Sequence, residues 1–81
     1  MNLIVSDLAP NTDLKDLQKL FEKYGKVRGV TLHDEGDPNR LTCVVNMDED
    51  HKTSKYIAEK LNNTMWKEQK LQVYAPLFFS R

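Results

Sequence analysis

Two short stretches that alternate apolar and polar residues, 3–8 and 40–47, constrain the fold of this chain more than any other feature. Alternation with a period of two is typical of a strand that buries one of its faces. In the first stretch the inward residues are Leu3, Val5 and Leu8, and the opposite face carries Ile4 and Ser6. A helical pattern follows each stretch, so the sequence predicts two units of a strand and a helix.

The residues after the first strand predict a helix that begins near Thr12 or Asp13 and ends at Gly25. Threonine and aspartate are common N-caps, and glycine commonly follows the last turn of a helix. The apolar positions of this helix are Leu14, Leu17, Leu20, Phe21 and Tyr24. A second helix is expected from Asp48, Glu49 or Asp50 to about Asn62, because carboxylates are favoured at a helix start. Its apolar stripe consists of Thr53, Ile57 and Leu61, beside Ala58.

Two further strands complete the pattern. Val27–His33 alternates around an irregularity at Gly29, and Leu71–Ala75 alternates until Pro76 ends it. The order of strand, helix, strand, strand, helix, strand predicts an α+β fold, a ferredoxin-like βαββαβ sandwich. We expect a four-stranded antiparallel sheet with two helices on one face, and the other face bare.

The chain is expected to form one domain over residues 1–76, followed by an apolar tail at 77–81. The tail begins with Leu77, Phe78 and Phe79. Exposed apolar groups need a partner or a cover. The tail therefore either packs on the sheet or leads to a neighbouring domain. Because the first strand starts so near the beginning, we expect a domain cut from a longer protein.

Composition excludes several classes of protein. The 81 residues carry twelve Lys and Arg against twelve Asp and Glu, so the chain lacks the basic excess of a nonspecific nucleic-acid binder. The only cysteine, Cys43, stands in an apolar run, which excludes a disulfide framework. A buried thiol indicates a reducing compartment, the nucleus or the cytoplasm. The opening run is too short for a signal peptide or a membrane span, so no membrane partner is expected.

Nothing in the sequence predicts catalysis. The two histidines, His33 and His51, lie near no patterned set of cysteines or carboxylates that would form a metal site or activate a nucleophile. The sequence contains no glycine-rich phosphate-binding loop. We therefore expect a protein that is not an enzyme and that holds neither a cofactor nor a metal.

The order of the elements, together with several sequence segments at the expected spacing, resembles the RNA recognition motif (RRM) over essentially the whole chain. Leu3-Ile4-Val5-Ser6-Asp7-Leu8 is similar to the family's hexamer on its first strand, and Arg40 to Met47 stands in the place of its octamer. The other segments that resemble the family are Thr12-Asp13 through Tyr24-Gly25-Lys26-Val27 at the first helix, Leu61-Asn62-Asn63, and Leu71-Gln72-Val73. The resemblance implies an RNA platform on the bare face, where aromatic rings stack on unpaired bases.

This chain departs from the family at the stacking positions. The resemblance places them at Ile4, Thr42 and Val44, and none of these residues carries a ring. Arg40, the leading basic position of the octamer, is retained, and Met47 replaces its last, inward aromatic residue. Stacking contributes on the order of 1 to 3 kcal/mol per base. Ordinary binding on the platform is therefore expected to be weak.

The resemblance implies that the residues of the bare face contact RNA. Tyr74 is the one aromatic residue expected there, and it either stacks on a base or packs beside Ile4 and Val44. Arginines either hold phosphates through their bidentate geometry or remain solvated. The expected RNA-binding residues are Ile4, Ser6, Arg28, Thr31, His33, Arg40, Thr42, Val44, Asn46, Gln72 and Tyr74.

Charged and aromatic residues outside this face suggest further contacts. A secondary basic surface, which either meets an RNA backbone or is a solvated helix face, consists of Lys15, Lys19, Lys23 and Lys26. The loop after the second strand should repel phosphate, because it carries Asp34, Glu35 and Asp37. Trp66 stands near the place where some RRMs carry an aromatic residue for peptide capture, and a capping contact on the core is the favoured interpretation.

Two functions stay open at this point. The first is an RNA-binding module of a larger RNA-processing protein that binds single-stranded RNA weakly or by unconventional contacts. The second is a protein-interaction RRM whose sheet face is covered by the tail or by a partner. The expected partners are RNA, a protein or adjacent domains, and the isolated domain is expected to be a monomer.

Overall fold

The computed structural model describes residues 1–33 and 39–76. The elements are β1 (Asn2–Leu8), α1 (Leu14–Glu22), β2 (Val27–His33), β3 (Leu41–Met47), α2 (His51–Leu61), β4 (Met65–Trp66), β5 (Gln69–Lys70) and β6 (Gln72–Tyr74). The apolar tail at 77–81 and the acidic loop residues Asp34, Glu35 and Asp37 lie outside the described residues. The expectations about them stay predictions.

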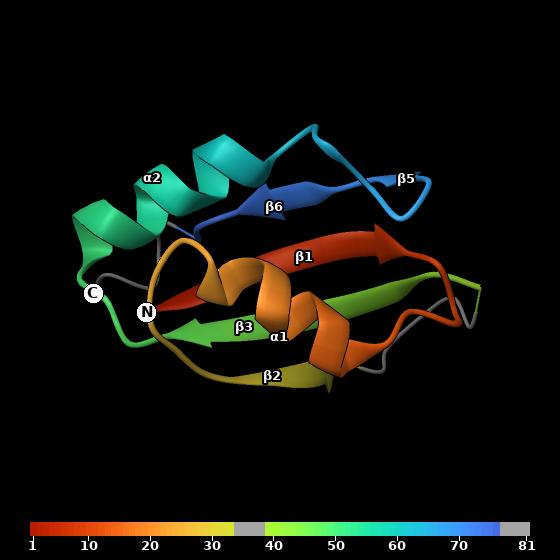
Figure 1. The fold of residues 1–81 in the computed structure, drawn as a ribbon, viewed down its shortest axis with the longest axis horizontal. Coiled ribbons are helices and arrows are strands. Elements are labelled where there is room, and N and C mark those ends of the chain that lie inside the picture. The colour runs from red at the N-terminus through yellow and green to blue at the C-terminus, as the bar shows by residue number, and fades with distance from the viewer. Residues whose placement is uncertain (34–38, 77–81) are drawn as a thin grey trace.

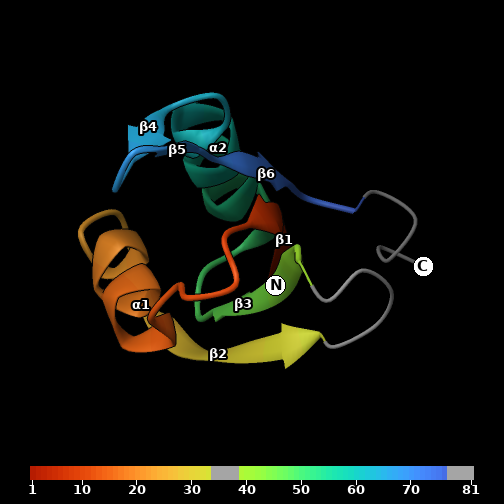
Figure 2. The ribbon, with the colours of Figure 1, turned by 90° about the vertical axis from the view of Figure 1, so that its right-hand side faces the viewer.

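Four strands form one antiparallel sheet in the order β2-β3-β1-β6 (Figure 1). Both helices lie on the same side of this sheet (Figure 2). The contacts of α1 are mainly with β2, and those of α2 are with β6 and β1. The predicted βαββαβ sandwich is confirmed. Neither helix of the described part is long and apolar enough to cross a bilayer.

The hydrophobic core lies between the sheet and the two helices. Successive side chains of a strand point to opposite faces, so β1 and β3 send alternate residues into the core, and β2 contributes the partly buried Val27 and Val30. The core residues are Leu3, Val5 and Leu8 from β1, Cys43, Val45 and Met47 from β3, Leu17 and Phe21 from α1, Ile57, Ala58 and Leu61 from α2, and Leu71 and Val73 around β6. The inward residues expected for the first strand are confirmed, as is the inward Met47.

Two irregularities interrupt the strand pairing, and the one near Gly29 was predicted from the sequence. The register of β1 on β3 shifts between Val5 and Leu8, and Asp7 has a φ of 59° there. Aspartate adopts this left-handed region more readily than most residues. The register of β2 on β3 shifts between Val27 and Gly29. A bulge changes the direction of the side chains next to it. The two bulges therefore affect the orientation of the charged side chains at the ends of the sheet.

The first helix ends earlier than its apolar spacing predicts. Asp13 is its N-cap, and Lys23 already caps its C-terminus. Tyr24 follows the helix and is 44% exposed, so its expected place in the buried stripe was wrong. The turn passes close to α2, because a Cβ at Gly25 would lie 3.0 Å from Cδ1 of Ile57. Glycine permits this approach, and the chain leaves the helix before Tyr24 reaches the core.

The second helix begins after Asp50, the last of the three carboxylates proposed for its start. The Asp50 carboxylate accepts a hydrogen bond from the Thr53 amide at 2.7 Å, and this bond lowers the pKa of Asp50 from its ordinary value. Ser54 is fully buried, whereas Thr53 is half-buried, so the expected stripe was wrong at this turn. Ser54 is accommodated because its hydroxyl donates to the Glu49 carbonyl at 3.5 Å.

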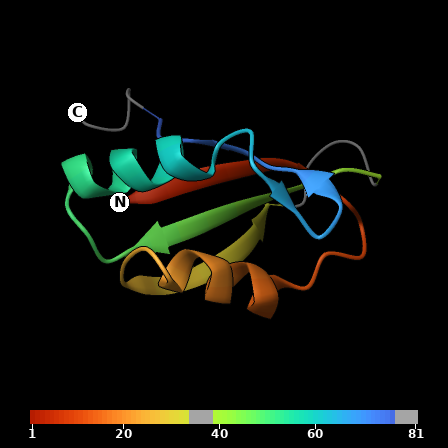
Figure 3. The same ribbon diagram turned by 45° about the horizontal axis from the view of Figure 1, so that its top comes forward.

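A short hairpin between α2 and β6 was not predicted. The single last strand expected over 71–75 is shorter, and β4 pairs with β5 outside the main sheet (Figure 3). Lys67 and Glu68 connect the two strands with φ values of 50° and 65°. Positive φ at both residues is typical of a two-residue hairpin turn, which is usually signalled by Asn-Gly. Without that signal, the sequence indicated only a loop.

Candidate nucleic-acid interface

A row of side chains crosses all four strands on the sheet face opposite the helices. The strand register aligns Thr31 with Val44, Val44 with Ile4, and Ile4 with Tyr74. Since the neighbours of these residues along the strands point into the core, the row points away from it. The structure therefore brings together one expected residue from each strand.

A shallow hollow of about 400 Å³ lies along this row. Its lining residues are Asn2, Ile4, His33, Thr42, Val44 and Tyr74. Five of these six are expected RNA-binding residues. Asn2 was missed because the first strand was expected to begin at Leu3, whereas β1 begins one residue earlier. The same alternation that placed Ile4 on this face places Asn2 there, two residues before it.

The centre of the hollow is aliphatic. Ile4, Thr42 and Val44 are half-buried, and they occupy the positions where an aromatic ring was expected from the family resemblance. Tyr74 lies directly across from Ile4 in the register and is 53% exposed. The tyrosine therefore adjoins the aliphatic centre and also keeps much of its surface open to solvent.

Polar groups surround this centre. Asn46 is exposed and pairs in register with Asn2 on one side and Gly29 on the other. On the far side of β1, Ser6 pairs with Gln72, which is exposed. Amide side chains both donate and accept hydrogen bonds, so these residues offer the groups that recognise base edges.

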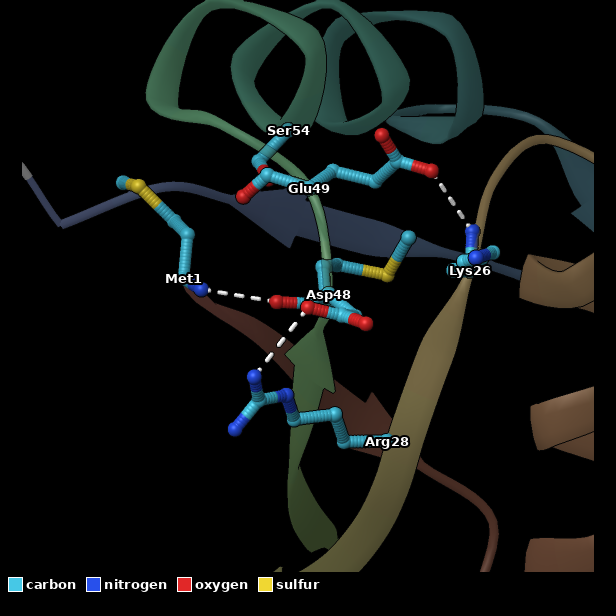
Figure 4. A network of polar contacts seen from close by, with 7 residues as sticks. Met1, Lys26, Arg28, Asp48, Glu49 and Ser54 are labelled. Atoms are coloured by element: carbon cyan, nitrogen blue, oxygen red, sulfur yellow. Dashed lines mark hydrogen bonds and ion pairs between the residues drawn. The ribbon is translucent and has the colours of Figure 1, made fainter.

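Arg28 faces the Asp48 carboxylate at one end of the sheet, whereas the Glu49 carboxylate accepts a hydrogen bond from the Lys26 amide (Figure 4). The Arg28 guanidinium donates to the Asp48 carboxylate at 3.2 Å. A hollow of about 530 Å³ next to this pair is lined also by Glu49 and Asp50. In the same region the N-terminal ammonium donates to the Met47 carbonyl at 2.8 Å. A phosphate that approaches Arg28 therefore meets several negative charges.

Arg40 is paired in the same manner at the first bulge. It donates to the Asp7 carboxylate at 3.2 Å. The Arg40 and Arg28 side chains are 67% and 66% exposed, and ion pairs at such exposure contribute only about 0 to 1 kcal/mol. A phosphate can replace either carboxylate at small cost, but each guanidinium is already engaged.

The expected secondary basic surface lies apart from the hollow. Lys15 and Lys19 belong to α1, Lys23 is its C-cap, and Lys26 precedes β2. All four are exposed. Because α1 packs on the other side of the sheet, the structure does not bring these lysines together with the residues of the hollow.

Trp66 caps one end of the core, as expected. It is half-buried against the core residues, and Nζ of Lys67 lies 5.5 Å from the centroid of its ring. Lys67 also forms an ion pair with Asp16 of α1. Gln69 accepts a hydrogen bond from the Ala9 amide at 2.9 Å. These contacts fasten the hairpin to the loop before α1 and to α1 itself.

Within residues 1–33 and 39–76, no group of three or more His, Cys, Asp or Glu residues is placed to hold a metal ion. Cys43 is a free thiol in the core, and burial raises its pKa. A thiol with a raised pKa is a poor nucleophile. The residues that line the hollow on the sheet face offer hydrogen bonding, apolar contact and ring stacking.

Comparison with known proteins identifies the family. The sequence profile of the RNA recognition motif matches residues 3–72. The comparison with curated proteins gave no match. The third RRM domain of Mip6 is similar in structure, with a TM-score of 0.78 and 19% identity over 89% of this chain and 88% of that chain.

Two other solved structures show the same arrangement. The RNA binding protein PG1 has a TM-score of 0.76 and 25% identity over 95% of this chain and 94% of that chain. RNA recognition domains 1 and 2 of Sex-lethal from Drosophila melanogaster give a TM-score of 0.73 and 22% identity over 93% of this chain and 49% of that chain. The Mip6 and Sex-lethal likenesses show the fold, and the profile match covers most of the sequence. The chain therefore belongs to the RNA recognition motif family, whose members generally bind RNA.

Proposed function

We propose that this domain is an RNA-binding module of a larger RNA-processing protein, and that it binds single-stranded RNA weakly through unconventional contacts. The observation that carries the proposal is the composition of the hollow. This hollow lies on the open face, where the family resemblance implies the RNA platform, and its lining includes Ile4, Thr42 and Val44 in place of aromatic residues. Tyr74 supplies a ring at its border.

One stacked base accounts for on the order of 1 to 3 kcal/mol, and a platform with two or three rings gains this amount for each of them. With Tyr74 as the stacking residue, the free energy of stacking is several kcal/mol less favourable than on a platform with two or three rings. The exposed amides of Asn2, Asn46 and Gln72 compensate in part, because hydrogen bonds to base edges add affinity and selectivity. We therefore expect dissociation constants far above those of a domain with a complete aromatic set.

The test is a titration of the protein with a pool of random eight-nucleotide single-stranded RNAs, followed by amide NMR shifts. Shifts are expected at the residues that line the hollow. Tyr74→Ala should weaken binding about tenfold or more, because it removes the stacking surface, whereas Tyr74→Phe should retain most of the affinity. Since Tyr74 is 53% exposed, the fold should tolerate both changes. Absence of any shift at millimolar RNA contradicts the proposal.

A second candidate function is protein interaction through the same face. The observation that favours it is the aliphatic pair Ile4 and Val44 at the centre of an open sheet. Apolar groups in this position suit a side chain of a partner, or the apolar tail, as well as a base. A domain that gives no RNA-dependent shift in the titration would favour this function. In either case we propose a reducing compartment, the nucleus or the cytoplasm, for a protein with the buried free thiol of Cys43.

A further inference from the structure

Tyr74 lines a second hollow as well as the one on the sheet face. This hollow, of about 240 Å³, lies between α2 and β6, which run side by side at the edge of the sheet (Figure 1). Lys55 and Glu59 of α2 line it, together with Asn62 and Val73. Tyr74 therefore stands at the junction of two hollows, one on the open face and one along the helix. A ligand that stacks on Tyr74 lies at the entrance to both.

One backbone donor of β6 is already occupied by a side chain that lines this hollow. An edge strand normally offers unpaired backbone groups to a partner strand. Here the Val73 amide donates to the side-chain oxygen of Asn62 at 3.0 Å. An incoming strand would have to replace this bond. The hollow between α2 and β6, called the groove from here on, therefore favours a ligand recognised by charge and by ring contact over a peptide that extends the sheet.

Lys55 supplies a positive charge to the groove, although Glu59 also lines it. Lys55 is exposed and forms no ion pair within 4.0 Å in the described part of the chain, in contrast to Arg28 and Arg40, which have carboxylate partners. Lys52 lies one helical turn before Lys55 and is also exposed. Lys55, which lines the groove together with Tyr74, is thus available to receive a phosphate.

We propose that single-stranded RNA does not end at the sheet but crosses the β6 edge at Tyr74 and continues into the groove along α2. One base stacks on Tyr74, and a phosphate of the following segment pairs with Lys55. Glu59, four residues further along the same helix, lines the groove and opposes the phosphate, so it limits the affinity. This inference rests on the proposed function, because it needs RNA on the sheet face.

The test compares random-sequence RNA pools of four and eight nucleotides by fluorescence anisotropy. For the eight-nucleotide pool, Lys55→Gln should lower affinity about two- to fivefold, the effect of one exposed ion pair. It should also reduce the slope of log affinity against log salt by about 0.7, the value of one phosphate contact on a single strand. Glu59→Gln should act in the opposite direction. The four-nucleotide pool should respond less to both changes.

Lys60→Gln is the matched control, because Lys60 is an exposed lysine of the same helix that does not line the groove. Equal losses for Lys55→Gln and Lys60→Gln would indicate a nonspecific effect of charge and would overturn the proposal. It is likewise overturned if Tyr74→Ala weakens binding while Lys55→Gln does not, which would leave the sheet-face function standing. If neither RNA pool binds the unaltered chain, the proposed function and this inference both fail.

Discussion

At the scale of single residues, three side chains occupy the positions where the resemblance to the family predicts aromatic rings. Ile4, Thr42 and Val44 face outward at the centre of the sheet, where the family places rings. Their backbone positions are those of the ordinary fold, since the register pairs Ile4 with Val44 and with Tyr74. The weak stacking that we propose would thus follow from side-chain identity, and we expect a substitution to restore stacking without rebuilding the sheet.

Ile4→Phe should raise the affinity for single-stranded RNA. The new ring would lie beside Tyr74 and offer a second stacking surface, for a gain on the order of 1 to 3 kcal/mol, or roughly five- to 150-fold. Fluorescence anisotropy with the eight-nucleotide pool measures the change, and Ile4→Leu controls for altered packing without a ring. An Ile4→Phe protein that folds normally and binds no better than Ile4→Leu would show that RNA does not reach this position.

At the scale of elements, the hairpin of β4 and β5 is the segment where local preference and structure disagree. Lys67 and Glu68 hold left-handed backbone angles, with φ of 50° and 65°. Residues with a side chain adopt this region at a cost of roughly 1 to 2 kcal/mol. The contacts of Trp66 with the core, of Lys67 with Asp16 and of Gln69 with Ala9 offset that cost. Tertiary contacts therefore impose the turn.

Glu68→Gly should stabilise the domain by about 0.5 to 1 kcal/mol. Glycine adopts a positive φ without steric cost, although its greater freedom in the unfolded chain cancels part of the gain. Urea unfolding followed by circular dichroism provides the midpoint, and Glu68→Ala serves as the control because alanine retains a Cβ. A lower midpoint for Glu68→Gly than for Glu68→Ala would be incompatible with the left-handed turn.

At the scale of the whole molecule, a chain without net charge has an uneven distribution of charge. All nine lysines fall within residues 15–26 and 52–70, where only four acidic residues lie. These two ranges contain most of α1, most of α2 and the hairpin. Arg28 lies in β2 of the main sheet, and Arg40 directly precedes β3. Both arginines have carboxylate partners. The sheet face therefore presents little uncompensated positive charge to RNA.

This distribution predicts a weak dependence of RNA binding on salt. We expect a slope of log affinity against log salt no steeper than about −2, because few RNA phosphates would contact a basic side chain on the sheet face that lacks a carboxylate partner. The double variant Asp7→Asn, Asp48→Asn releases both arginines and should steepen the slope by up to about 1.4, or about 0.7 for each new contact. Asparagine is suitable at position 7 because it tolerates the left-handed φ there. An unchanged slope would mean that neither arginine approaches the RNA.

Much of the fold was predictable from the sequence because its signals are local. Alternation in β1 and β3 fixed which residues face the core, and the bulges at Asp7 and Gly29 broke the pattern visibly. The failures occurred where a neighbouring element acts on the chain. Gly25 approaches Ile57 closely just after α1 ends, and Trp66 and Lys67 make tertiary contacts beside a turn that lacks its usual residues.

The sequence by itself determined the order of the elements, the two faces of the sheet and the absence of rings at three central positions, since these depend on residue type and spacing along the chain. Only the tertiary structure decided which distant residues meet. It placed Tyr74 beside Ile4, paired Arg28 with Asp48 and Arg40 with Asp7, and opened a groove between α2 and Tyr74. The physical reason is that strand register and side-chain pairing join segments far apart in the sequence, and no local pattern records those contacts.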